Sequence, residues 1–149
     1  MTEPTPGDPT AGKQEVEQRR EQLPSEVVMA ALEAARSGLG EEFVSYFSDD
    51  LDFWFPGTTP ISGRRQGLPA FIEYLGQVAS YLSEMIVVEL TNVVVTGEWV
   101  FTEATGHGVT KKGLDYDNSY CLVWQVRDGK VIRFVEYCDT ELVSTVLCA

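Results

Sequence analysis

The second half of the chain is an almost unbroken run of strand-forming sequence, and this run restricts the fold more than any other feature. Four segments rich in Val, Thr, Phe, Tyr and Trp span about residues 85–96, 98–110, 114–126 and 130–139. They are separated only by Gly97 and by the tripeptides Lys111–Gly113 and Arg127–Gly129. Because such short connections join antiparallel neighbours, the four segments predict an antiparallel meander.

Helical sequence precedes these strands. Apolar residues recur at helical spacing from Pro24 to Gly38, over Glu41–Phe47 and over 68–85. Before the third of these segments, residues 49–67 predict a short aromatic strand followed by a loop rich in Pro and Gly. Helices first and a meander last indicate an α+β domain, in which the helices pack on one face of a curved antiparallel sheet.

The length of 149 residues suits one domain. Residues 1–23 are rich in Pro, Gly, Thr and charge and contain few large apolar side chains, so they cannot offset the entropy of becoming ordered. We therefore expect a flexible N-terminal tail at 1–23 and one domain at 24–149.

Charge and composition exclude several classes of partner. The net charge of −12 and pI of about 4.4 repel phosphate backbones and anionic lipids, so we expect neither nucleic acid nor a membrane as partner. No apolar run approaches the roughly 18–20 residues of a membrane helix, and a cytoplasmic protein is expected. Three cysteines without a CxxC pair and a single histidine predict no disulfide framework and no metal site.

The first of two tight turns sets part of the strand register. A three-residue hairpin loop that ends in Gly suits a type I turn followed by a left-handed residue. If Lys111–Gly113 forms such a loop, Tyr120 lies opposite Ala104 and Asn118 lies opposite Gly106.

The second turn sets the register of the last strand. If Arg127–Gly129 forms the same kind of loop, Tyr120 lies opposite Glu136. A type I′ turn at 128–129 would instead shift the pairing by one residue and exchange the two faces.

If both turns are three-residue loops, one face of the sheet is apolar apart from a few polar groups. Its members are Thr102, Ala104, Gly106, Tyr116, Asn118, Tyr120, Leu122, Trp124, Ile132, Phe134, Glu136 and Cys138. Small residues at 104, 106 and 108 leave room in front of this face, which predicts a pocket for a small molecule. The opposite face carries His107 and a mixture of polar and apolar residues, which suits solvent or a homodimer contact.

The predicted order helix, helix, aromatic strand is followed by the segments PISGRRQGLPAFIEYL and YDNSYCLVWQVRDGKVIRFVEYCDTEL. By this ordered set, residues 25–148 resemble the nuclear transport factor 2-like superfamily, and within it the SnoaL-like group related to ketosteroid isomerases and polyketide cyclases. The resemblance implies a cone-shaped fold, in which a curved antiparallel sheet packs on three N-terminal helices around an enclosed pocket, and it implies a homodimer.

The resemblance also implies that two known family sites are missing. The Arg-x-Asp element of limonene epoxide hydrolases corresponds to TEATG, which contains no arginine, and their Tyr and Asn correspond to Phe53 and Phe55. The catalytic base of ketosteroid isomerases corresponds to Trp54 or Phe55, so that carboxylate is missing too. SnoaL-like cyclases use an acid on the last strand, which Glu136 matches, and a histidine on a neighbouring strand. His107 fits that second role only if its flanking glycines form a bulge.

Glu136 is the main catalytic candidate, with Tyr120 and His107 beside it. A carboxylate in an apolar pocket has a raised pKa and can remove a proton next to a carbonyl group. Tyr120 would donate to the developing enolate oxygen, with Asn118 orienting the substrate. The alternatives are a ligand contact without catalysis, or a structural acid bonded to Tyr120 and Asn118.

The expected substrate-binding residues surround this acid. They are Asn118, Tyr116, Phe134, Leu122, Trp54, Phe55, Tyr74 and Arg64. Arg64 and Arg65 follow Gly63 at the expected pocket mouth, where they are solvated charges, gate the pocket or contact an acidic substrate.

The sequence as a whole predicts a small-molecule isomerase or cyclase that works by proton transfer without a cofactor. The expected substrate is a largely apolar or polycyclic carbonyl compound. A non-catalytic ligand-binding or dimerisation module is the main alternative, and an epoxide hydrolase with a rearranged site is a further one.

Overall fold

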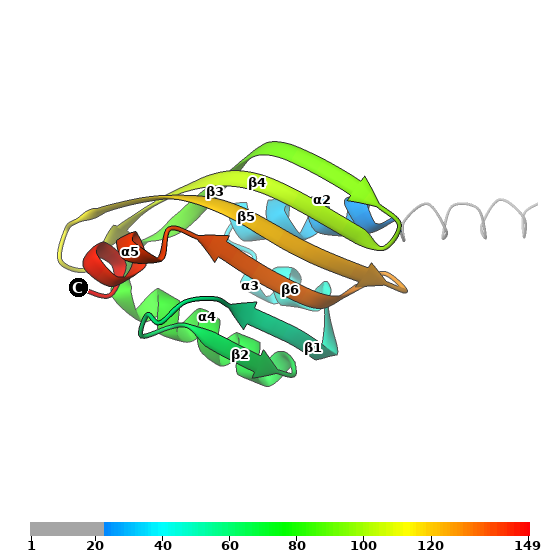
Figure 1. Cartoon of the computed structure of the whole chain (residues 1–149), viewed down its shortest axis with the longest axis horizontal. Coiled ribbons are helices and arrows are strands. Elements are labelled where there is room, and N and C mark those ends of the chain that lie inside the picture. Colours follow the sequence, from blue (N-terminus) through cyan, green and yellow to red (C-terminus); the bar gives the residue numbers. More distant parts are fainter. Residues whose placement is uncertain (1–22) are drawn as a thin grey trace, which may run out of the picture.

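The computed structural model describes residues 23–149, so the tail expected at 1–23 lies outside the described residues except for Leu23. In chain order the elements are α2 (Pro24–Arg36), α3 (Gly40–Ser45), β1 (Phe47–Phe55), β2 (Gly63–Gln66), α4 (Leu68–Tyr81), β3 (Leu82–Thr96), β4 (Trp99–Thr110), β5 (Asp115–Arg127), β6 (Lys130–Cys138), α5 (Thr140–Leu142) and the π-helix η1 (Val143–Leu147). Figure 1 shows the expected α+β architecture, with helices packed on a curved sheet.

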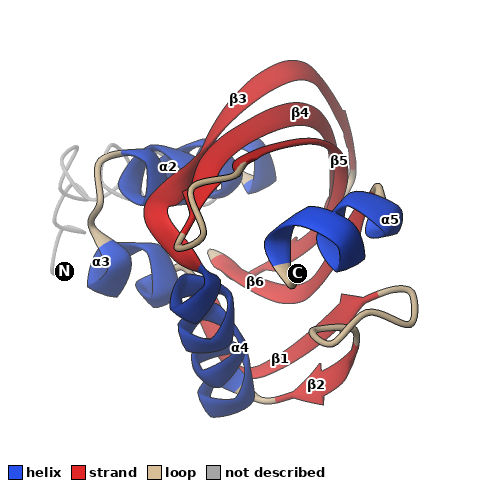
Figure 2. Cartoon of the chain, turned by 90° about the vertical axis from the view of Figure 1, so that its left-hand side faces the viewer, coloured by secondary structure: helices blue, strands red, loops and turns tan. Residues whose placement is uncertain are grey.

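One sheet of six strands organises this part of the chain, in the order β2-β1-β6-β5-β4-β3. β1 runs parallel to β6, and the other neighbouring pairs are antiparallel. The expected meander is confirmed as β3 to β6. Figure 2 shows the strong curvature of the sheet and shows α2, α3 and α4 gathered on one side of it. The helices and the inner face of the sheet therefore enclose the core.

Aromatic rings fill the space between the helices and the sheet. Phe71 of α4 lies 4.8 Å from the ring of Phe47 and 4.8 Å from the ring of Phe53, both on β1. Trp124 of β5 stacks on Phe134 of β6 at 4.2 Å. All five side chains are almost fully buried, so they tie α4 to the centre of the sheet through apolar contact.

The expected register between β4 and β5 is confirmed. Ala104 lies opposite Tyr120 and Gly106 lies opposite Asn118. The room expected in front of Gly106 is not free, however. A Cβ atom at Gly106 would lie 2.8 Å from the Tyr120 ring and 2.9 Å from Ile86, so these two side chains occupy the space that the glycine leaves.

The expected register between β5 and β6 is wrong by two residues. Asp128 and Gly129 both have positive φ, at 51° and 74°, and form a two-residue turn that shifts the pairing by one. A bulge near Ile132 then shifts it by one more. Two shifts of one residue restore the original parity, so Glu136 stays on the inner face but lies opposite Leu122, while Tyr120 lies opposite Cys138.

Several other boundaries differ from the expectation. The stretch 63–66, expected as part of a loop, is strand β2, and it pairs with β1. The third helix ends at Tyr81 because Leu82 is already extended, with φ −105° and ψ 138°. The chain does not end on a strand, since α5 and η1 follow β6 and bury Val143 and Leu147 in the core. Within the described residues, no helix is long and apolar enough to cross a membrane.

We expect Gly106→Ala to destabilise the fold, because the new methyl group would overlap the Tyr120 ring and Ile86. Overpacking of this kind costs about 1–3 kcal/mol of the free energy of unfolding, which urea denaturation measures. Gly76→Ala in α4 is the matched control: a Cβ there meets nothing within 4 Å, so the same change should be neutral or stabilising. Equal effects at the two positions would contradict the close packing at Gly106.

Candidate functional site

Glu136 lies on the inner face of β6, between Phe134 and Cys138. Its Oε2 atom accepts a hydrogen bond of 3.1 Å from the hydroxyl of Tyr74. Tyr74 comes from α4 and is only 3% exposed, so the bond joins the helix layer to the sheet inside the molecule. Since one carboxylate oxygen is held by Tyr74, the other is left for a different partner.

The surroundings of Glu136 favour its neutral form. Burial is the main cause and raises its pKa from an ordinary 4.5 to about 7, while the Tyr74 hydrogen bond and the positive charge of Arg65 act in the opposite direction. The side chain is nevertheless only half-buried, so solvent reaches it. An accessible carboxyl group that titrates near neutrality can accept or donate a proton under physiological conditions.

Arg65, rather than Arg64, lies on the Glu136 side of the sheet. Residues alternate along β2, so Arg65 is half-buried and Arg64 is exposed. The Arg65 guanidinium lies 4.8 Å from the centre of the Tyr74 ring, and its Nη2 donates to the Ile61 carbonyl at 3.0 Å. Arg64, which we expected at the site, instead stacks on Trp54 at 4.2 Å on the outer side. The alternation would have distinguished the two arginines had 63–66 been predicted as a strand.

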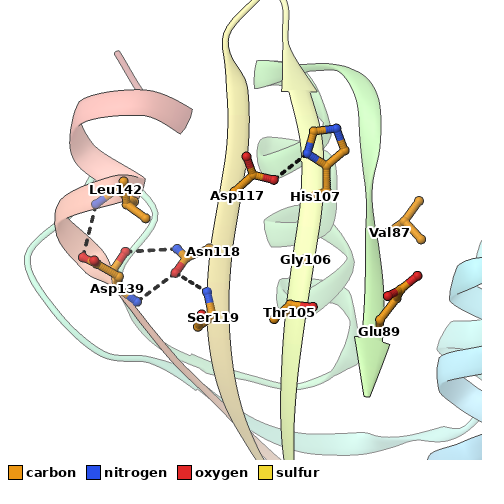
Figure 3. Close-up of a pocket in the computed structure, with 10 residues that line it drawn as sticks. All are labelled: Val87, Glu89, Thr105, Gly106, His107, Asp117, Asn118, Ser119, Asp139 and Leu142. Carbon is orange, nitrogen blue, oxygen red and sulfur yellow. Dashed lines mark hydrogen bonds and ion pairs between the residues drawn. The ribbon is translucent and has the colours of Figure 1, made fainter. Parts of the chain in front are cut away.

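Asn118 has a structural position. Its Nδ2 donates to the Tyr116 hydroxyl at 2.7 Å and to the Asp139 carbonyl at 3.0 Å. Its Oδ1 accepts from the backbone N–H groups of Ser119 and Asp139, at 2.8 and 3.1 Å. These contacts use both donors and the acceptor, so the amide fastens β5 to the start of α5 (Figure 3).

Tyr120 and Tyr116 add two hydroxyl groups to the inner face of β5. Burial raises the pKa of Tyr116 to about 12 and raises that of Tyr120 further, so both are neutral at physiological pH and can donate hydrogen bonds. The charge of Glu136 contributes to both shifts, which places the two tyrosines in its electrostatic surroundings.

The remaining expected residues divide between the core and the outer face. Phe55, Leu122 and Phe134 are buried in the hydrophobic core. Trp54 lies on the outer face, where its ring meets that of Tyr137 at 5.9 Å.

His107 also lies on the outer face, and its strand has no bulge toward β5 at the flanking glycines. Its Nδ1 lies 2.6 Å from Oδ1 of Asp117, and this contact raises the pKa of His107 (Figure 3). The pair lines a hollow of about 570 Å³ together with Glu89, Asn118 and other residues. Glu136 is not part of that lining, so His107 and Glu136 do not line the same pocket.

Two further kinds of site can be judged from the described residues. Residues 23–149 contain no group of three or more His, Cys, Asp or Glu side chains that could hold a metal ion. Cys121, Cys138 and Cys148 are all free thiols.

Comparison with known proteins gives one family and many similar structures. The family model of the SnoaL-like domain matches residues 28–134. No curated protein matches the chain.

Three of the similar solved structures illustrate the likeness. An NTF2-like protein of unknown function from Burkholderia pseudomallei has 16% identity and a TM-score of 0.78 over 85% of this chain and 98% of its own. TerC, co-crystallised with polyporic acid, has 20% identity and a TM-score of 0.76 over 85% and 98%. A candidate isomerase from Bacillus subtilis has 20% identity and a TM-score of 0.69 over 85% and 91%. The TM-scores establish a common fold with these three proteins.

The raised pKa of Glu136 predicts a pH-dependent stability. Between about pH 4.5 and about pH 7 the unfolded chain loses this proton while the folded protein keeps it, so the free energy of unfolding falls as the pH rises. Each pKa unit corresponds to about 1.4 kcal/mol, which gives a loss of up to about 3 kcal/mol.

Glu136→Gln cannot ionise and should escape this loss. Urea denaturation of both proteins at about pH 5 and about pH 8 should therefore show the variant gaining stability relative to the parent at the higher pH. Groups elsewhere titrate in both proteins and cancel in the comparison. A stability difference that is the same at both pH values would contradict the raised pKa.

Proposed function

This chain belongs to the SnoaL-like domain family of the nuclear transport factor 2-like superfamily, and from that membership we propose that it is a cofactor-independent isomerase or cyclase. Its substrate would be a largely apolar small molecule with a carbonyl group. The observation that carries the proposal is the half-buried Glu136, whose pKa is about 7 and whose carboxylate is held by Tyr74.

In this proposal Glu136 acts first as a base and then as an acid. Its free carboxylate oxygen removes a proton from the carbon next to the carbonyl group. The C–H electron pair forms a C=C bond, and the carbonyl π pair moves to the oxygen to give an enolate. An isomerase then returns the proton from Glu136 to another carbon of the enolate. In a cyclase, the enolate carbon attacks a second carbonyl group, and the new alkoxide takes the proton.

Two groups near Glu136 support this role. The Tyr74 hydrogen bond fixes the carboxylate and limits the rise of its pKa, which keeps the ionised form available at neutral pH. Tyr120 is neutral and can donate a hydrogen bond to the enolate oxygen. Tyr74 is therefore proposed as the positioning residue and Tyr120 as the oxyanion donor.

The similar structures are consistent with small-molecule chemistry. TerC was crystallised with polyporic acid, and the Bacillus subtilis protein is named as a candidate isomerase. A ligand-binding module without turnover is the second candidate. It is favoured by the packing of Tyr120 against Gly106, which reduces the interior space, and by the full set of bonds at Asn118.

We also propose that the outer face of the sheet pairs two copies of the chain. One row of register partners crosses five strands and is apolar throughout: Val94, Phe101, Val123, Val135 and Trp54. Val94 and Phe101 are 52% and 37% exposed, so an apolar surface remains at one end of the row.

Proton transfer can be tested without the natural substrate. In D₂O the protein should exchange the α-hydrogens of 2-tetralone, a bicyclic ketone, and NMR follows their loss. Glu136→Gln should lower the exchange rate at least about 100-fold, because general-base catalysis contributes roughly 10²–10⁴-fold. The same variant should retain the affinity for the ketone, because the amide keeps the shape of the side chain.

Tyr74→Phe provides a check on the assignment of the base. Loss of its hydrogen bond should raise the pKa of Glu136, so the midpoint of the pH–rate profile should move upward. Binding of the ketone with no exchange by the parent protein would favour the ligand-binding module over the enzyme.

Phe101→Asp should convert a dimer into a monomer, because it places a charge on the apolar row. Sedimentation velocity measures the result. Leu114→Asp is the control: Leu114 is 43% exposed but lies in the turn between β4 and β5, away from the row, so the dimer should persist. A monomeric parent protein, or a dimer that survives Phe101→Asp, would contradict this interface.

A further inference from the structure

One buried side-chain atom in the described part of the chain has no hydrogen-bond partner, and that atom is Nη1 of Arg65. A buried N–H group without an acceptor costs free energy, and the cost is larger when the group is charged. Native structures pair nearly all such groups, so an unpaired one calls for a physical reason. The donor lies in the same part of the interior as Tyr74 and Glu136.

The loop before β2 holds the Arg65 guanidinium in place. The hydroxyls of Thr59 and Ser62 lie 2.7 Å apart, and the Ser62 hydroxyl also accepts from the Thr59 N–H and donates to the Pro56 carbonyl. This bonded loop presents the Ile61 carbonyl to Nη2 of Arg65 at 3.0 Å. One edge of the fork is therefore fixed by backbone, while Nη1 is buried without an acceptor.

The aromatic rings of the core support the flat side of the same guanidinium. Its carbon lies 4.8 Å from the centre of the Tyr74 ring and 5.9 Å from that of Phe53. Such cation–π contacts stabilise the position of the cation but supply no hydrogen-bond acceptor. They orient Arg65 directly over the tyrosine whose hydroxyl bonds to Glu136.

Arg65 and Glu136 interact electrostatically but do not form a salt bridge. The positive charge of Arg65 acts on the carboxyl group, yet the salt bridges of residues 23–149 do not include this pair within 4.0 Å. Glu136 takes its hydrogen bond from Tyr74 instead. A base and an unpaired cation thus flank one aromatic ring, as expected for two groups that act on different atoms of one ligand.

We propose that Arg65 binds the reacting oxygen of the substrate, and that the substrate is a readily enolised carbonyl compound whose oxygen becomes anionic when Glu136 removes the adjacent proton. Carboxylates carry the same charge on an oxygen of the same kind and can stand in for it as probes. The inference rests on the proposed function and specifies its substrate class. A guanidinium pairs with a carboxylate or enolate oxygen through charge-assisted hydrogen bonds, which a neutral carbonyl oxygen matches only weakly. Such an oxygen would satisfy Nη1 and place the adjacent C–H group toward Glu136.

Pairs of acids and their neutral amides test the charge preference. The probes are 2-naphthoate with 2-naphthamide, and biphenyl-4-carboxylate with its amide, measured by isothermal titration calorimetry at about pH 6. At this pH the acids are ionised, while Glu136 is largely neutral and does not repel them. Each acid should bind the parent protein at least about tenfold more tightly than its amide, as for other charge-assisted contacts.

Arg65→Met should remove this preference, because methionine keeps the apolar length but carries no charge. Arg65→Lys should retain part of it. Arg64→Met is the matched control, since it makes the same change one residue earlier, on the outer side against Trp54, and should leave the preference intact.

Three outcomes would overturn the assignment. If neither acid binds the parent protein more tightly than its amide, Arg65 does not select an anionic oxygen. If Arg64→Met removes the preference as fully as Arg65→Met, the selectivity comes from general surface charge. If Arg65→Met does not fold, Arg65→Lys replaces it in the comparison. A preference for acids that is unchanged in Arg65→Lys but lowered in Arg64→Met would then count against Arg65. Glu136→Gln separates this inference from the proposed function, because it should lower the exchange of 2-tetralone at least about 100-fold while keeping the preference for acids.

Discussion

The contact of α4 with the centre of the sheet determines the rest of this structure. Phe71 and Tyr74 occupy the same face of that helix, and their rings meet Phe53 at 4.8 and 4.6 Å. One helical face therefore supplies an apolar anchor to the core and the hydroxyl that reaches Glu136. Because the rings of this anchor are almost fully buried, the Tyr74 hydroxyl is held in place without a further loss of side-chain entropy. The chemistry of the interior thus depends on the packing of the core.

For predicting the site from the sequence, knowing which face of the sheet each residue lies on mattered more than knowing which residue it pairs with on the next strand. Alternation along β4 and β5 correctly assigned their faces, since a confirmed turn fixed that pairing. The last hairpin has the two-residue turn at 128–129 that the sequence offered as the alternative, together with a bulge that the pattern RDGKVIRF does not reveal, because a bulge depends on how the backbone meets its neighbours. The two offsets cancelled in parity, so Glu136 was placed on the correct face but beside the wrong residue.

The features that the sequence did not predict depend on tertiary contacts. The sequence suggests empty space in front of Gly106, but the side chains of Tyr120 and Ile86 occupy it. Only the three-dimensional structure distinguishes a cavity from a filled gap. The strand at 63–66 is short and lies in a segment rich in Pro and Gly, so its pairing with β1 carries no local signal. For that reason Arg64 and Arg65 could not be assigned to opposite faces. The first three helices and the meander β3 to β6, by contrast, follow from periodicity and from the turn residues between the strands.

The parallel pairing of β1 with β6 has a consequence for how the chain folds. Phe53 and Phe134 are register partners, although one belongs to the first strand and the other to the last. The centre of the sheet therefore forms only when distant parts of the domain meet, while the hairpins β3 to β6 can close locally. Contacts of such large sequence separation slow folding, since the entropy of closing the intervening chain is lost before the contact is gained. The hydrogen bond between Tyr74 of α4 and Glu136 of β6 joins residues 62 positions apart, so the surroundings of the acid carry the same entropic cost of closing a long stretch of chain.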